Sequence, residues 1–198
     1  MGSHSNDDTY LKVVVPKRIA LFESIKAEQL SHLRSIAGGP IKITLEDGAI
    51  KEGRKWETSP LDVAKGISKS LAASGLIAQV DGVLWDMTRP LEGDCELKIF
   101  NFDHNEGRDT FWHSSAHILG QALDMEYGCK LSALGLARPG ERASTMMHFM
   151  ENWASTKITK SKLRLVQEKQ PFERIEVTRD QALDMFSENP FKVEIIND

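Results

Sequence analysis

The sequence contains little that would place it in a membrane or in an oxidising compartment. It has two cysteines in 198 residues, Cys95 and Cys129, and no apolar run approaches the roughly 20 residues that span a bilayer. The first residues have no apolar core and include Asp7 and Asp8, which is wrong for a secretory signal and for an arginine-rich transit peptide. We therefore expect free thiols, a cytoplasmic location and no membrane contact.

The sequence also lacks the positive charge of a general nucleic-acid binder. Its net charge is −4, and its 40% hydrophobic and 27% charged residues are typical of a globular protein. Glycine-rich phosphate loops are absent. Contact with RNA would need a local basic face, and the candidate residues are Lys42, Lys51, Arg54 and Lys55. Because Glu46, Asp47, Glu52 and Glu57 lie between or beside them, the pattern favours an ordinary solvated hairpin.

The pattern before residue 57 predicts a leader helix and then a β-hairpin. Apolar residues recur near helical spacing from Pro16 to about Ala37, and two glycines and a proline follow. Residues 41–45 alternate between apolar and polar, and a second predicted strand covers 49–56. The Asp47-Gly48 pair between them is typical of a tight hairpin turn. The leader is assigned to residues 1–39.

The next part of the chain completes a small α+β domain. Thr58 or Ser59 can cap a helix that starts near Pro60 and ends around Ser74-Gly75. Short strands are predicted at 77–80, 83–85 and 96–100. A hairpin, a helix and short strands in this order indicate a β-grasp fold over residues 40–101. Trp56 and Trp85 fit turn or core packing better than base stacking.

The pattern after residue 101 predicts a second, less regular part. Asp103–Arg108 is polar and suggests a linker, and a helix is predicted from about Asp109 to Tyr127. Thr178 with Gln181 fits a capping box for a helix that runs to Phe186. Alternating residues predict strands at 172–177 and 191–196.

Two histidines, His113 and His117, are the sharpest chemical feature of the predicted helix at 109–127. At positions i and i+4 they lie on one helical face, where two imidazoles can bind a metal or orient water and an oxyanion. A metal site needs a third ligand, which this helix does not offer, and no glutamate lies between them, so the zinc-protease pattern does not apply. From the spacing alone, two histidines satisfied by hydrogen bonds are the favoured interpretation.

Several motifs along the chain resemble those of known protein modules. Three of them, Pro40-Ile-Lys-Ile-Thr-Leu-Glu-Asp-Gly48, Thr58-Ser-Pro-Leu-Asp-Val-Ala64 and Val80-Asp-Gly-Val-Leu-Trp-Asp86, resemble a TGS domain, a β-grasp module. A fourth, Trp112-His-Ser-Ser-Ala-His-Ile-Leu-Gly-Gln-Ala122, is similar to the opening helix of the editing domain of threonyl-tRNA synthetases. Segments within 168–195 resemble later parts of that domain. Together they resemble the amino-terminal region of the eukaryotic cytosolic members of that family. The resemblance thus implies an α+β chain with a TGS domain at 40–101 and a partial editing domain at 108–198.

The resemblance implies a threonine–tRNA ligase of cytosolic translation, with threonine-specific tRNA as partner. It also implies editing, in which His113 and His117 help to hydrolyse serine wrongly attached to that tRNA, without a metal. The ligase core of the family, which uses ATP and zinc, and the second editing motif are absent from this chain. We therefore expect no cofactor here, and a homodimer only in the full-length form. The alternatives are a non-catalytic module that binds tRNA or a partner, a free-standing editing hydrolase and a non-functional truncated product.

Residues 132–166 depart from the family. A shifted reading frame combines the third base of each codon with the first two bases of the next. In that frame, codons for Gly140–Met147 can encode Gly-Glu-Gly-Phe-Tyr-Tyr-Asp. This shifted peptide resembles the sequence of the family at the same place. The same shift works from Ser132 to about Ile158. We interpret this part as translated out of frame, by mutation or by a wrong gene model, and Thr159–Val166 as a mis-spliced join. An uninterrupted transcript that encodes the chain as written would remove the gene-model explanation.

Overall fold

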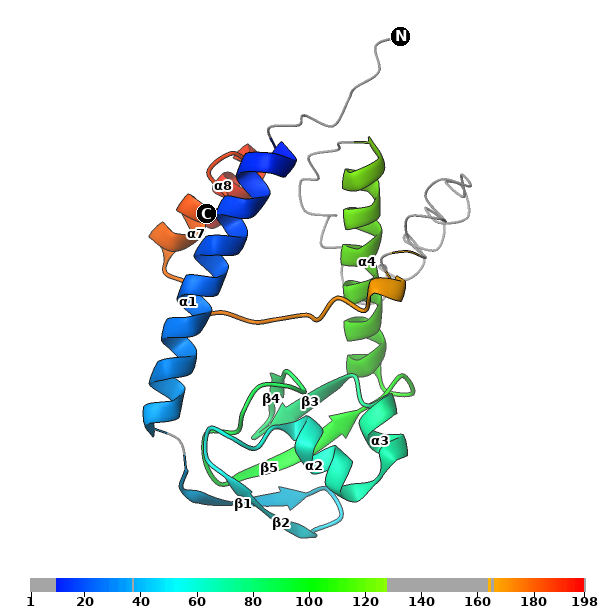
Figure 1. Ribbon diagram of the computed structural model, residues 1–198. Coiled ribbons are helices and arrows are strands. Elements are labelled where there is room, and N and C mark those ends of the chain that lie inside the picture. The colour runs from blue at the N-terminus through cyan, green and yellow to red at the C-terminus, as the bar shows by residue number, and fades with distance from the viewer. Residues whose placement is uncertain (1–9, 37, 128–163, 165, 198) are drawn as a thin grey trace. The chain divides into compact units, whose positions relative to one another are not determined.

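The computed structural model describes residues 10–36, 38–127, 164 and 166–197 (Figure 1). They fall into two compact units. The sheet unit is Leu30–Trp112, and the histidine unit combines Met1–Gln29 with His113–Asp198. Helices α1 (Val15–Ile36) and α4 (Asn105–Tyr127) each continue from one unit into the other. None of the helices in the described ranges is long and apolar enough to cross a membrane.

The sheet unit is built on five strands, which confirms the α+β, β-grasp prediction. They are β1 (Pro40–Leu45), β2 (Ile50–Arg54), β3 (Ile77–Val80), β4 (Val83–Trp85) and β5 (Cys95–Phe100). Their order is β2-β1-β5-β3-β4. Strand β5 pairs in parallel with β1 and antiparallel with β3, so two hairpins flank one central strand. The predicted hairpin turn is confirmed, because Gly48 has a φ of 81° and Leu45 N–H donates to Ala49 O at 2.8 Å.

The core of the sheet unit lies between one sheet face and helix α2 (Pro60–Ile67). Alternate residues point to this face, as the period of two predicts, and Ile43 and Leu97 are almost completely buried. Helix α2 adds Val63 and Ala64, and the loop before β5 adds Leu91. Leu91 N–H donates to Thr58 O at 2.8 Å, which ties that loop to the start of α2.

Helix α2 is shorter than the sequence predicts. Ser59 is its N-cap and forms a capping box with Asp62, whereas the Thr58 hydroxyl accepts from Arg54 N–H. The predicted single helix to Ser74 is wrong, because Ser68 has extended backbone angles and separates α2 from α3 (Lys69–Ser74). The Ser68 hydroxyl accepts from Leu71 N–H at 3.0 Å, so it caps a new helix instead of continuing the old one.

Two further boundaries in the sheet unit differ from prediction. Strand β2 ends at Arg54, and Trp56 lies in the following turn with a φ of 62°. Trp85 is half-buried against the core, in agreement with its predicted packing role. The predicted linker 103–108 is partly helical, because α4 begins at Asn105. A Cβ on Gly107 would lie 1.9 Å from the carbonyl oxygen of Asn101, so this close approach requires glycine.

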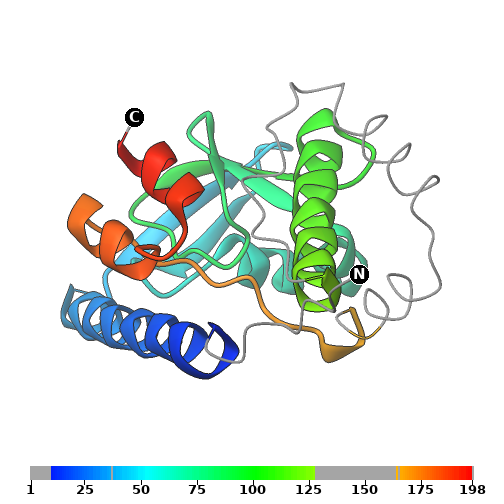
Figure 2. The same cartoon turned by 90° about the horizontal axis from the view of Figure 1, so that it is seen from above.

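The histidine unit contains the first part of α1, most of α4 and two short helices. Helix α1 agrees with prediction and follows a π-helical turn, η1 (Tyr10–Val14). Helix α7 (Arg179–Met185) begins with the predicted capping box of Thr178 and Gln181. Figures 1 and 2 both show α7 and α8 beside the first part of α1. The out-of-frame hypothesis stays a prediction, because residues 128–163 and 165 lie outside the described residues.

The two strands predicted in the tail are wrong. Residues 172–177 have no regular secondary structure, and Glu176 pairs its backbone with the Gln29 side chain instead of a strand. The predicted strand 191–196 is helix α8 (Pro190–Asn197). The Asn189 side chain accepts from Lys192 N–H at 3.2 Å, and Pro190 is the first helical residue. This pair is typical of a helix start and outweighs the strand-like alternation.

Candidate functional site

His113 and His117 are adjacent on the exposed surface of α4. Their Nε2 atoms are 3.0 Å apart, and the ring centroids are separated by 4.7 Å with an angle of 71° between the planes. The i, i+4 spacing thus places both rings on one face, as the sequence predicts. Both residues are exposed, so a large substrate can reach them.

The contact between the rings constrains their protons. A hydrogen bond between two ring nitrogens requires one donor and one acceptor, so a single proton lies between the two Nε2 atoms. Two fully protonated rings would bring like charges together at this distance. The pair can therefore accept a proton and can orient a water molecule or an oxyanion.

The environment of His117 favours its neutral form. Partial burial of the ring lowers its pKa below the ordinary 6.5, and the charges of His113 and Lys192 lower it further. Lys192 comes from α8. The tail also reaches α4 one turn beyond His117, where Gln121 Nε2 donates to Gln170 Oε1 at 3.1 Å. The segment around Gln170 thus contacts the helix that carries the pair.

The described residues offer no metal centre, since no three of their histidine, cysteine, aspartate or glutamate side chains are placed to hold an ion. Cys95 is a free, half-buried thiol. Its burial, followed by the charges of Asp81 and Asp94, raises its pKa to about 11. It is therefore protonated at neutral pH and is a poor nucleophile. Cys129 lies outside the described residues.

The four basic residues around the first hairpin do not form one face. The strand register places Lys42 opposite Glu52, and Lys51 belongs to the alternate set of β2 that points to the other side of the sheet. Arg54 pairs with Glu57 at 2.9 Å, and Lys55 lies over the Trp56 ring at 5.9 Å. This arrangement agrees with the solvated hairpin favoured by the charge pattern.

Comparison with known proteins finds relatives that match both units of the chain. The TGS domain family matches residues 41–101. The chain is 56% identical over 200 residues to "Threonine--tRNA ligase, mitochondrial 1" of Arabidopsis thaliana, which covers 99% of this chain and 28% of that protein. This chain is a homologue of the amino-terminal region of threonine–tRNA ligases. Its resemblance to that family is thereby confirmed.

More distant threonine–tRNA ligases match over a slightly smaller share of the chain. "Probable threonine--tRNA ligase 1, cytoplasmic" of Dictyostelium discoideum is 46% identical over 188 residues, which is 92% of this chain and 26% of that protein. "Threonine--tRNA ligase 2, cytoplasmic" of Homo sapiens is 38% identical over 196 residues, which is 94% of this chain and 24% of that protein. The chain thus spans about a quarter of the length of these ligases.

Sequence reasoning predicted that the two histidines are adjacent but not that the tail reaches α4. Gln121 follows His117 by one helical turn, whereas Gln170 and Lys192 carry no local signal because they are distant from the pair in sequence. The Asn189-Pro190 pair was a usable signal for α8, since an asparagine cap followed by proline is typical of a helix start. Such an interpretation would have placed Lys192 in the first turn of a helix.

Proposed function

We propose that this chain is part of a threonine–tRNA ligase that acts in cytoplasmic translation, and that His113 and His117 belong to a site that hydrolyses seryl-tRNA. The exposed histidine pair, with Nε2 atoms 3.0 Å apart, carries the proposal. The partner is a threonine-specific tRNA, and homodimerisation is expected only of the full-length protein. ATP and zinc are expected to bind in the ligase core, which lies outside this chain.

The chemistry of the pair suits ester hydrolysis. The reaction needs a water molecule aimed at the aminoacyl carbonyl and a donor for the developing oxyanion. One ring can accept the proton of water while the N–H of the other stabilises negative charge. His117 is suited to the first role, since its lowered pKa keeps it neutral at neutral pH. An editing step is useful because a synthetic site cannot strongly reject a substrate that lacks one methyl group.

The test measures deacylation of threonine tRNA charged with serine, with threonyl-tRNA as the comparison substrate. Because the second editing motif is absent from this chain, the histidine pair is an incomplete editing site, and the test uses the full-length ligase. We expect it to hydrolyse the seryl ester and to lose about 100-fold or more of that rate in His113→Ala and His117→Ala. His32→Ala is the matched control, because His32 is an exposed histidine on α1. The rate should fall as the pH drops through the lowered pKa of His117, below 6.5, because the ring then carries the proton it must accept.

Three other results would overturn this proposal. Salt-sensitive binding of tRNA without deacylation would indicate a non-catalytic binding module. Neither binding nor deacylation would indicate a product without retained function. Hydrolysis that persists in both histidine variants would place the reaction elsewhere in the chain.

A further inference from the structure

The exposed face of α4 that carries the histidine pair continues for one more helical turn. Gln121 follows His117 by four residues and His113 by eight, so these three side chains form one row along the helix, the α4 row. Successive members of such a row are about 6 Å apart along the helix axis. All three residues are exposed. A substrate that reaches the two rings can therefore also reach the end of the Gln121 side chain.

The tail holds the amide of Gln121 in one orientation. The Nε2 of Gln121 donates to Gln170 Oε1 at 3.1 Å. Gln170 donates from its own Nε2 to one carboxylate oxygen of Glu168 at 2.7 Å, and Arg164 Nε donates to the other at 2.9 Å. The bond from Arg164, followed by that from Gln170, lowers the pKa of Glu168 below its ordinary 4.5. This carboxylate is therefore ionised at neutral pH and keeps the Gln170 amide oriented toward α4.

The orientation of this amide decides which atom Gln121 offers to a ligand. An amide side chain has two N–H donors on nitrogen and one carbonyl oxygen that accepts. Because Nε2 is bonded to the tail, the oxygen Oε1 is the part of the amide left for another molecule, and no group in the described ranges donates to it. Gln121 thus presents a fixed hydrogen-bond acceptor one helical turn beyond His117.

The substrate of the proposed reaction has a group that needs such an acceptor. In an aminoacyl ester, the carbon next to the reacting carbonyl carries an ammonium group, which has three N–H donors and no acceptor. The two histidine rings are needed for the water molecule and the developing oxyanion. A carbonyl oxygen is a better neighbour for the ammonium group than a ring that gains a proton during the reaction, because like charges repel. In the α4 row, Gln121 supplies that oxygen.

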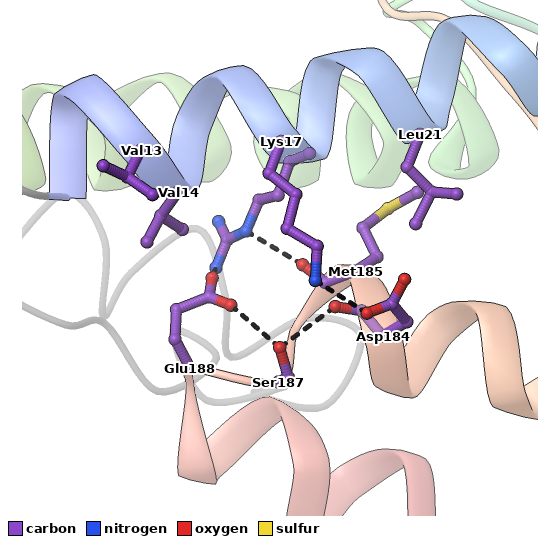
Figure 3. Close-up of a pocket in the computed structure, with 9 residues that line it drawn as sticks. Val13, Val14, Lys17, Leu21, Asp184, Met185, Ser187 and Glu188 are labelled. Atoms are coloured by element: carbon purple, nitrogen blue, oxygen red, sulfur yellow. Dashed lines mark hydrogen bonds and ion pairs between the residues drawn. The ribbon is translucent and has the colours of Figure 1, made fainter.

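A pocket elsewhere in the histidine unit does not offer a competing site. Figure 3 shows it between α1 and the turn that joins α7 to α8. Its volume is about 160 Å³, whereas binding sites for small molecules usually have about 300–1,000 Å³. The basic side chains on its wall already have acidic partners, Lys17 with Asp184 and Arg18 with Glu188. Neither its size nor its charges suit the aminoacyl end of a tRNA, which the exposed α4 row can meet.

We propose that Gln121 is a substrate-binding residue of the histidine site, and that its Oε1 accepts a hydrogen bond from the ammonium group of the seryl ester. Gln170 is a positioning residue, because it acts only through the Gln121 amide. This inference rests on the proposed function and extends it from the hydrolytic pair to a group that holds the aminoacyl end. Serine and threonine both carry the ammonium group, so the contact sets affinity for that end and not the choice between the two.

The experiment uses the full-length ligase and two esters of threonine tRNA. One is the seryl ester, and the other is the 3-hydroxypropionyl ester, which is the seryl ester without its amino group. Gln121→Met removes the acceptor and keeps the shape of the side chain. We expect kcat/KM for the seryl ester to fall about 10-fold or more, mainly through a higher KM, since a hydrogen bond to a charged group is lost. Hydrolysis of the 3-hydroxypropionyl ester should not change, because it has no ammonium group to bind.

Two further variants and a control separate binding from folding. Gln121→Glu should keep the rate on the seryl ester close to that of the unmodified ligase, because a carboxylate also accepts from an ammonium group. Gln170→Ala should cause a smaller loss, on the seryl ester alone, because it leaves the Gln121 amide free to rotate. Gln79→Met is the matched control and should affect neither ester. Gln79 lies on β3 of the sheet unit, where its Nε2 donates to Gly82 O at 3.1 Å.

The outcomes distinguish this proposal from the proposed function. Equal losses on the two esters in Gln121→Met would overturn it, because the effect would not involve the ammonium group. A loss in Gln121→Glu as large as that in Gln121→Met would also overturn it. Unchanged hydrolysis of the seryl ester in Gln121→Met would overturn this proposal alone, provided that His113→Ala abolishes the reaction. Absence of hydrolysis in the unmodified ligase would overturn both.

Discussion

The two units of this chain are stabilised by different kinds of contact. In the sheet unit, a continuous cluster of buried apolar side chains joins the sheet to α2, and Ile43, Ala64 and Leu91 have no exposed surface. In the described part of the histidine unit, the buried apolar residues are Ile25, Leu119 and Ala122, and ion pairs and side-chain amides help to join distant segments.

The difference predicts how each unit responds to change. Burial of apolar surface is non-directional and is not screened by ions, so the stability of the sheet unit should change little with ionic strength. Exposed ion pairs contribute little and are screened by salt. The tail of the histidine unit is held to its neighbours by such contacts, so we expect local opening to be easier there than in the sheet.

The largest expected effect comes from opening the apolar core of the sheet unit. Leu97→Ala removes a side chain that is 1% exposed at the centre of β5. The free energy of unfolding of this unit should fall by about 2–5 kcal/mol, measured by urea denaturation with tryptophan fluorescence. Leu84→Ala is the control, because Leu84 on β4 is 53% exposed. Similar losses for the two variants would contradict the assignment of the core.

A smaller effect is expected where α4 leaves the sheet unit. Gly107→Ala would place a Cβ 1.9 Å from the Asn101 oxygen, so the backbone must move. We expect a loss of about 1–3 kcal/mol in the same denaturation experiment. Gly66→Ala in α2 is the matched control, because its Cβ would meet no atom within 4 Å. That variant should instead stabilise the protein by about 0.5–1 kcal/mol.

The two capping boxes give the smallest effect and the most direct comparison of the units. Ser59→Ala and Thr178→Ala should each cost about 1 kcal/mol in their own unit. Only the first box titrates. Burial acts to raise the pKa of Asp62, but hydrogen bonds from Ser59 and Lys65 outweigh it and lower the pKa below 3.8.

The sign of the pH effect follows from that lowered pKa. The stabilisation by Asp62 is present above the unfolded value of 3.8 and is lost as the pH falls through the folded value. NMR signals of α2 should therefore report fraying in acid, whereas the Thr178–Gln181 box of α7 should not, since glutamine does not titrate. Asp62→Asn should remove this pH dependence. Equal acid sensitivity of the two capping boxes would contradict this prediction.

Sequence reasoning was most accurate where a feature depends on a few neighbouring residues. The Asp47-Gly48 turn and the alternation around Ile43 were predicted and found, and Ser59 is one of the two residues predicted as the cap. So was the adjacency of His113 and His117, since helical geometry alone brings i and i+4 together. It failed at residues 191–196, whose pattern suits either a strand or a helix, so that the choice depends on the asparagine cap before it.

The sequence by itself determined the local elements of the sheet unit and the face on which the histidines lie, because each follows from backbone geometry over a few residues. Only the tertiary structure decided that β5 pairs with β1, where Ile43 lies opposite Cys95, 52 positions further along the chain. The same holds for the ion pair between Arg18 and Glu188, which are 170 residues apart. Such contacts leave no periodic trace in the chain. They form because distant segments bury apolar surface or satisfy charges together, and a pattern read along one segment does not contain its partner.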